Sequence, residues 1–161
     1  MQGDLYMHKV WVLAAGVLFL AAGAASAAQK VKVIDGDSIV VDGVEMRLEG
    51  IDAPEYHQIC YDADKKGYRC GIKARDYLLR LTAGKKVSCK KLSVDRYKRQ
   101  VSVCYASGQD INREMVLAGW AVAYDRYSDD YVGAEKEARK QRRGIWQGKF
   151  MKPELWRRLN D

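Results

Sequence analysis

The sequence predicts an α+β fold: a small five-stranded β-barrel of the OB type with three helices packed outside it. Two stretches, 30–52 and 86–105, largely alternate apolar and polar residues, which is typical of strands that bury one face. Asp42-Gly43 is a tight hairpin signal within the first stretch. Segments with apolar residues at helical spacing lie between and after these strands. Short antiparallel strands interspersed with helices are characteristic of such barrels, which commonly bind oligonucleotides.

The first stretch, 30–52, supplies the opening strands. Gly36 breaks the first of them, which is consistent with a bend or turn that aims the side chains of Asp35 and Asp37. A polar loop over 56–68 follows the strands.

Helices are expected over Gly71–Leu81, over Ile111–Ala118, and from Ser128 or Asp129 to about Arg143. The first carries one apolar stripe and stops before Gly84, while Asp110 caps the second. Gly144 stops the third. Two further strands, 86–92 and 100–105, lie between the first and second helices.

The N-terminal 28 residues differ in composition from the rest. Lys9 precedes an apolar run, Val10–Ala25, and small residues follow it, which is the pattern of a secretory signal peptide. The alternative is an uncleaved membrane anchor, because Val10–Ala28 is just long enough to span a bilayer. We expect a cleaved signal peptide over 1–28, a folded domain over 29–150, and a basic and aromatic tail over 151–161. The protein would then be exported, either periplasmic or secreted.

The chain has 28 Lys and Arg against 21 Asp and Glu, a net charge of +7. A basic exported domain attracts polyanions, which are nucleic acid, anionic lipid or anionic glycans. The alternative is a charge that serves solubility and has no partner.

All four cysteines follow the signal segment, and an even number in an exported chain indicates disulfides. Of the three possible pairings we favour Cys60–Cys70, which would close a polar loop, and Cys89–Cys104, which would link neighbouring strands. A zinc site is the alternative, although no pair of cysteines has ligand spacing. Free buried thiols at Cys89 and Cys104 are the alternative if the protein is not exported.

Acidic residues mark the ends of two strands and suggest a cation site. Asp37 follows Gly36, and Asp52 ends another strand, so their carboxylates converge if the strands are neighbours. The Ala53 carbonyl is free to join them, because the proline after it disfavours helix. Oxygen ligands of this kind suit calcium. Taken singly, each aspartate also reads as a turn residue.

Glu55 and two arginines complete a candidate catalytic set. Glu55 lies just beyond Asp52 and is a candidate general base, with His57 as the other candidate. Arg47 and Arg99 offer planar forks that match a phosphate. The alternatives are a solvated loop acid and surface ion pairs. Together the acids and arginines suggest metal-assisted cleavage of a phosphodiester.

These residues resemble the thermonuclease (staphylococcal-nuclease-like) family over Val31–Trp146. The motifs that carry the resemblance, in order, are Val33-Ile34-Asp35-Gly36-Asp37-Ser38, Arg47-Leu48, Ile51-Asp52-Ala53-Pro54-Glu55, Asp95-Arg96-Tyr97-Lys98-Arg99, Ile111-Asn112-Arg113-Glu114-Met115-Val116, Ala118-Gly119-Trp120-Ala121 and Gly144-Ile145-Trp146. Each is weak alone, and their order and spacing are specific. One departure is Lys98, which stands where the family often has glycine.

The resemblance implies an OB-fold barrel with three helices and calcium-dependent hydrolysis of DNA and RNA to 3′-phosphate products. It implies that Asp37, Asp52 and the Ala53 carbonyl bind calcium, that Glu55 positions or deprotonates water, and that Arg47 and Arg99 bind the phosphate. It also matches Arg96, Tyr97, Tyr124 and Tyr127 with substrate contacts, and stacking on such aromatics suits single strands.

Two other functions remain open. A non-catalytic OB-fold module would bind single strands without cutting them, but it would not need Arg47, Glu55 and Arg99 together with both aspartates. A membrane-tethered surface protein would use its basic face on lipid or envelope polymers, and would require residues 1–28 to remain uncleaved.

Overall fold

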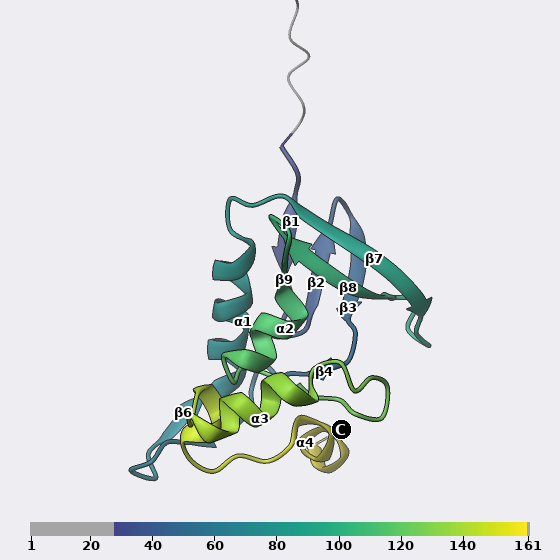
Figure 1. Ribbon diagram of the computed structural model, residues 1–161. Helices are drawn as coiled ribbons and strands as arrows, with labels where there is room; N and C mark the ends of the chain where they lie inside the picture. Colours follow the sequence, from purple (N-terminus) through teal and green to yellow (C-terminus); the bar gives the residue numbers. More distant parts are fainter. Residues whose placement is uncertain (1–27, 161) are drawn as a thin grey trace, which may run out of the picture.

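A computed structural model describes residues 28–160 (Figure 1). The signal peptide predicted over 1–28 therefore lies, except for Ala28, outside the described residues. The strands are β1 Val31–Val33, β2 Ser38–Val41, β3 Val44–Leu48, β4 Ile51–Asp52, β5 Ile59–Tyr61, β6 Gly67–Arg69, β7 Val87–Val94, β8 Gln100–Ala106, β9 Gln109–Asp110 and β10 Val122–Ala123. The helices are α1 Cys70–Thr82, α2 Ile111–Leu117, α3 Val132–Lys140, the 3₁₀ helix η1 Gly144–Gln147, and α4 Pro153–Asn160. Within 28–160, no helix has the length and apolar character needed to cross a bilayer.

The main sheet has the order β1-β2-β3-β8-β7, with β9 added to β8. Asp42 and Gly43 form the predicted hairpin turn between β2 and β3, and both adopt positive φ, at 48° and 87°. The pairing of β3 with β8 is parallel, whereas the sequence predicted antiparallel strands throughout. The predicted α+β class is confirmed, with a mixed sheet.

The predicted closed barrel is not reproduced among residues 28–160, because β1 and β7 share no strand pairing. A side chain bridges them instead. The amide of Gln29 donates to the Val87 carbonyl at 2.8 Å and accepts from the Val87 N–H at 2.7 Å. The strand β1 is only three residues long. The Gln29 side chain, two residues before it, supplies the hydrogen bonds to β7 that backbone pairing of β1 and β7 would otherwise provide.

Helices α1 and α2 cover the sheet and bury the main core. Apolar side chains from the strands and both helices meet there, among them Ile39, Leu48, Leu78, Ile111 and Met115. The apolar stripe predicted for the first helix accordingly faces the sheet. Four α-helices are present in 28–160, rather than the three predicted.

Both predicted disulfides are present. Cys60–Cys70 ties the β5–β6 hairpin to the first residue of α1, in a segment predicted to be a loop. Cys89–Cys104 joins directly paired positions of β7 and β8.

The additional helix is α4, which lies within the segment predicted to be a tail. Figure 1 shows α3 and α4 at the end of the molecule where β4 is found. Pro153 is the only buried residue described in α4. The Gln58 amide donates to the Met151 carbonyl at 2.7 Å and so fixes the chain just before this helix.

Candidate active site

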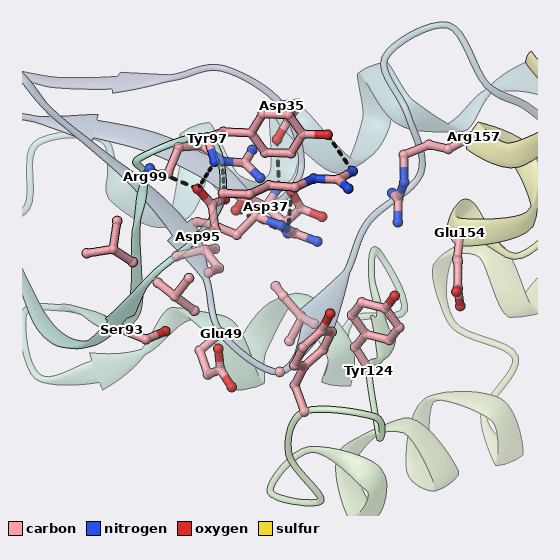
Figure 2. Close-up of a pocket in the computed structure, with 18 of the residues that line it drawn as sticks. Asp35, Asp37, Glu49, Ser93, Asp95, Tyr97, Arg99, Tyr124, Glu154 and Arg157 are labelled. Atoms are coloured by element: carbon pink, nitrogen blue, oxygen red, sulfur yellow. Dashed lines mark hydrogen bonds and ion pairs between the residues drawn. The ribbon is translucent and has the colours of Figure 1, made fainter. Parts of the chain in front are cut away.

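A pocket of about 890 Å³ opens beside β2, β3 and the β7–β8 turn, and α4 closes one side of it. Figure 2 shows Arg157 extending from α4 toward this pocket, on the side opposite Tyr97 and Arg99. Of the residues predicted from the sequence, those that line it are Asp37, Arg47, Glu55, Arg96, Tyr97, Arg99, Tyr124 and Tyr127. Segments distant in sequence thus meet at one cavity.

Asp37 and Asp52 are both buried, as the predicted cation ligands should be. Asp37 comes just before β2, and its carboxylate accepts a hydrogen bond from the Ala53 N–H at 2.7 Å. The Asp52 side chain is only 1% exposed and does not line the pocket directly. The pairing of β10 with β4 holds Asp52 opposite Val122. The three residues predicted to bind a cation are therefore neighbours in space.

Arg47 joins the two aspartates. Register in the β2–β3 hairpin places Ser38 opposite Arg47, which brings the adjacent Asp37 within reach. The Arg47 guanidinium forms ion pairs with Asp37 and, at 3.1 Å, with Asp52. Although burial lowers it, the charges of Asp37 and Asp52 raise the pKa of Arg47, so this arginine remains charged.

Glu55 faces the same pocket but is engaged by an arginine that the sequence analysis did not identify. Arg157 of α4 lies 2.6 Å from Glu55 Oε1 and contacts both carboxylate oxygens of Asp52, at 2.9 and 3.1 Å. Burial lowers the pKa of Arg157, but the hydrogen bonds to Asp52 and Glu55 outweigh it and raise the pKa. His57, the alternative base, is exposed, lies 3.4 Å from Arg69 and does not line the pocket.

The β7–β8 turn aims Arg99 at the site. The Asp95 carboxylate accepts hydrogen bonds from the Arg99 N–H and Nε, at 2.9 and 2.8 Å. Arg99 Nη1 lies 3.5 Å from Ser38 Oγ, which in turn is 3.4 Å from Asp37. Lys98 has φ of 68°, a conformation that favours glycine, so the turn retains the shape expected despite the lysine. Arg99 therefore lies beside Ser38, the neighbour of Asp37, while its own ion-pair partner is Asp95.

The predicted substrate-contacting residues lie around the rim. Tyr97 and Tyr127 are 63% and 65% exposed, so both side chains are largely accessible at the rim. Tyr127 packs edge-on against Tyr124, with ring centroids 4.9 Å apart. The Arg96 guanidinium lies 4.7 Å from the centroid of the Tyr97 ring. These side chains combine aromatic faces with positive charge, as single-strand binding requires.

The residues present fit a hard divalent cation in chemistry and in position. One guanidinium, that of Arg47, already spans the carboxylates of Asp37 and Asp52, so a single positive group can share them. Asp35 lines the same pocket, and its carboxylate accepts a hydrogen bond from the Asp37 N–H at 3.0 Å. No cluster of three His, Cys, Asp or Glu side chains suited to a metal occurs within 28–160. A cation here would draw its remaining oxygens from the Ala53 carbonyl and from water.

Two carboxyl groups at this site have raised pKa values. Burial and the adjacent charge of Asp37 raise the pKa of Asp35 to about 7. Burial, opposed by the hydrogen bonds from Arg157, raises the pKa of Asp52 to about 6. In both groups the largest cause is burial, which disfavours the charged carboxylate.

Sequence analysis missed Arg157 and Gln58. Gln58 is fully buried, and its Oε1 accepts from the Glu55 N–H at 3.1 Å, which orders the Glu55 loop. No local pattern marks that glutamine. Helix α4 did carry signals, namely Pro153 at its first position, Glu154 in its first turn and basic residues in its last turn.

Comparison with known proteins supports the family suggested by the motifs. Residues 45–148 match the model of the staphylococcal nuclease homologue family. A micrococcal nuclease of Shigella flexneri is 36% identical over 148 residues, which cover 81% of this chain and 79% of that protein. An uncharacterized endonuclease of Escherichia coli O157:H7 is 38% identical over 135 residues, or 79% of this chain and 82% of that protein. The succinoglycan biosynthesis protein ExoI of Rhizobium meliloti (strain 1021) is 38% identical over 141 residues, or 84% and 73%. The chain belongs to the staphylococcal nuclease homologue family.

Proposed function

We propose that this chain, a nuclease by family, is an exported, calcium-dependent endonuclease that hydrolyses DNA and RNA with little sequence specificity. The observation that carries the proposal is the convergence of Arg47, Glu55 and Arg99 on one pocket beside the buried pair Asp37 and Asp52. A protein that only binds single strands needs a basic groove and aromatic faces, but not a carboxylate base beside two arginines.

Each side chain has a defined role in this proposal. Arg47 and Arg99 bind the scissile phosphate and stabilise the charge that develops on its oxygens. Glu55 accepts a proton from the attacking water. Water attacks phosphorus in line with the 5′ oxygen, and the bond from phosphorus to that oxygen breaks. The leaving 5′ oxygen takes a proton from solvent, so that a 3′-phosphate and a 5′-hydroxyl result. Bound at Asp37, Asp52 and the Ala53 carbonyl, calcium would supply Lewis acidity and a template for the phosphate.

The rim of the pocket favours single strands as substrates. Tyr97 and Tyr127 expose their rings, and bases that are not paired can stack on such rings without regard to sequence. Arg96 beside Tyr97 adds positive charge for the backbone.

Export is proposed from the signal-like N-terminus and the disulfides, which form and persist in oxidising compartments. N-terminal sequencing of the protein recovered outside the cytoplasm tests it. A new terminus near residue 28 or 29 supports a cleaved signal, whereas an intact Met1 in a membrane fraction supports an anchor.

The central experiment measures cleavage of single-stranded DNA and RNA by the purified domain with calcium, and then with excess chelator. We expect cleavage with calcium only, and product 5′ ends that a polynucleotide kinase labels without prior phosphatase treatment. Glu55→Gln should lower turnover by roughly two orders of magnitude or more while binding persists. Tight binding without cleavage under every condition would instead identify a single-strand binding module.

A further inference from the structure

Asp52 is held on both of its oxygens by positively charged groups. Oδ1 contacts Arg157 at 2.9 Å and Arg47 at 3.1 Å, while Oδ2 contacts Arg157 at 3.1 Å. Its side chain is only 1% exposed. A cation that coordinates Asp52 would therefore have to displace the Arg157 guanidinium or bind beside its positive charge.

Arg157 also forms an ion pair with Glu55 and so neutralises its charge. Its Nη1 atom bridges Asp52 and Glu55, so one guanidinium neutralises a predicted ligand and the predicted base together. Two positive groups at contact distance repel strongly in a buried environment. For that reason the Arg157 contact and a divalent cation at Asp52 disfavour each other.

Helix α4 can release this contact without disrupting the core. Beyond Pro153, no described residue of α4 is buried, and the Arg157 side chain is 30% exposed. The other ion pair of the helix, Glu154 with Arg126, is at the surface, with an N–O distance of 3.3 Å. A change of Arg157 rotamer, or a movement of α4, would therefore free Asp52 at little cost to the core.

We propose that Arg157 is an internal competitor of the metal ion and sets the cation affinity of the site. The guanidinium occupies the Asp52 and Glu55 carboxylates in the resting protein, and cation binding must displace it. The affinity for calcium is therefore lowered by the free energy of breaking the Arg157 contacts, which makes loading depend on a high calcium concentration. This inference rests on the proposed cation-dependent function and assigns a role to a residue outside the matched segment 45–148.

The test is calcium binding by isothermal titration calorimetry, without nucleic acid. Arg157→Gln should bind calcium at least about tenfold more tightly than the wild type, because the competing charge is gone. Arg158→Gln is the matched control: it removes the same charge from the next residue of the helix, which also lines the pocket but is exposed and has no ion pair among the described residues. We expect its calcium affinity to stay within about twofold of the wild type, the scale of a screened surface charge.

Arg157→Lys guards against a folding defect in the glutamine variant, since lysine keeps the charge but lacks the planar fork that pairs with both Asp52 oxygens in parallel. Its affinity should fall between those of the wild type and Arg157→Gln. Circular dichroism checks that every variant is folded.

The outcomes separate this inference from the proposed function. Unchanged or weaker calcium binding by Arg157→Gln, or an equal gain in Arg158→Gln, overturns the competitor role while leaving chelator-sensitive cleavage by the wild type intact. If neither the wild type nor any variant binds calcium, and cleavage does not depend on it, both the inference and the calcium-dependent function fail.

Discussion

The carboxylate of Asp37 accepts a 2.7 Å hydrogen bond from the backbone N–H of Ala53, sixteen residues away. The bond joins the residue just before β2 to the residue just after β4, and both residues are buried. The carboxylate of Asp37 and the peptide of Ala53 are thus held together where two strands meet irregular segments. Preorganisation of this kind lowers the cost of assembling a cation site.

Gly36→Ala should disturb this arrangement. A Cβ at Gly36 would lie 2.5 Å from the Ala53 Cβ and 2.8 Å from the Ala74 Cβ, so one or both segments must shift. We expect a stability loss of about 1–3 kcal/mol and weaker calcium binding. Urea unfolding and calorimetry measure the two effects. Gly133→Ala in α3 is the control, because nothing lies within 4 Å of its Cβ and alanine favours helix.

Arg47→Lys should reduce turnover by about 10²-fold, the scale of losing one donor that stabilises the transition state. Lysine keeps the charge but cannot bridge Asp37 and Asp52 as the planar fork does. The measurement is kcat on single-stranded DNA at saturating calcium. Near-normal kcat would show that charge alone suffices at this position.

Tyr97→Ala should weaken binding of a single-stranded oligonucleotide by about fivefold to 10²-fold, the range that one stacked base contributes. Fluorescence anisotropy in excess chelator measures the Kd without cleavage. Tyr61→Ala is the matched control, since Tyr61 is 48% exposed on β5 and does not line the pocket. Equal losses in both variants would argue against stacking at the pocket.

The parts of the fold that local sequence encodes were predictable. Asp42-Gly43 occupies the expected turn, α1 runs from Cys70 to Thr82 against an expected Gly71 to Leu81, and both disulfides pair as favoured. The turn depends on a local residue preference, the helix on the regular spacing of its apolar residues, and the disulfides on cysteines that are close in sequence. Among the predicted site residues, Asp37, Arg47, Glu55 and Arg99 line one pocket, and their roles in catalysis stay predictions.

What escaped prediction depends on contacts between distant segments. The parallel pairing of β3 with β8 and the bridge from Gln29 to Val87 arise only when the sheet assembles. Arg157 meets Asp52 across 105 residues, so no local pattern could connect them. Asn112 likewise looks like an ordinary helix residue in the sequence. In the structure its buried amide accepts from the Cys104 N–H and donates to the Glu49 carbonyl.

Stability should depend on pH and calcium together. The pKa values of Asp52 and Asp35 are raised to about 6 and about 7, above the ordinary 3.8, so the calcium-free fold favours their protonated forms. Their contribution to stability is full below pH 3.8 and is lost as pH rises through 6 to 7. Calcium binds the deprotonated carboxylates, so the rise in the Tm of the protein on adding calcium should be larger at pH 8 than at pH 5.

Asp35→Asn is the control for this prediction, since the amide keeps the side-chain shape without titrating. Differential scanning calorimetry of the calcium-free variant should show a smaller loss of Tm between pH 5 and 8 than the wild type. An increase in Tm with calcium that is the same at pH 5 and pH 8 would mean that protons and calcium do not compete at this site.

The two disulfides should differ in what their removal does to activity. Cys60→Ala with Cys70→Ala and Cys89→Ala with Cys104→Ala should each cost about 2–4 kcal/mol in urea unfolding, the usual range for a native disulfide. Cys70 begins α1, and a Cβ at the adjacent Gly71 would lie only 1.8 Å from the Glu55 carbonyl, so the first disulfide anchors the helix end that packs on the base. The second joins strands that β7–β8 pairing already holds together. The measurement is kcat at a temperature well below both unfolding transitions. We expect kcat to fall in the first double variant and to stay within about threefold of the wild type in the second. A change of about threefold is small beside the roughly 10²-fold loss that misplacement of a reacting group can cause. Equal kcat values would show that Glu55 is positioned by Gln58 and the sheet without help from the Cys60–Cys70 bond.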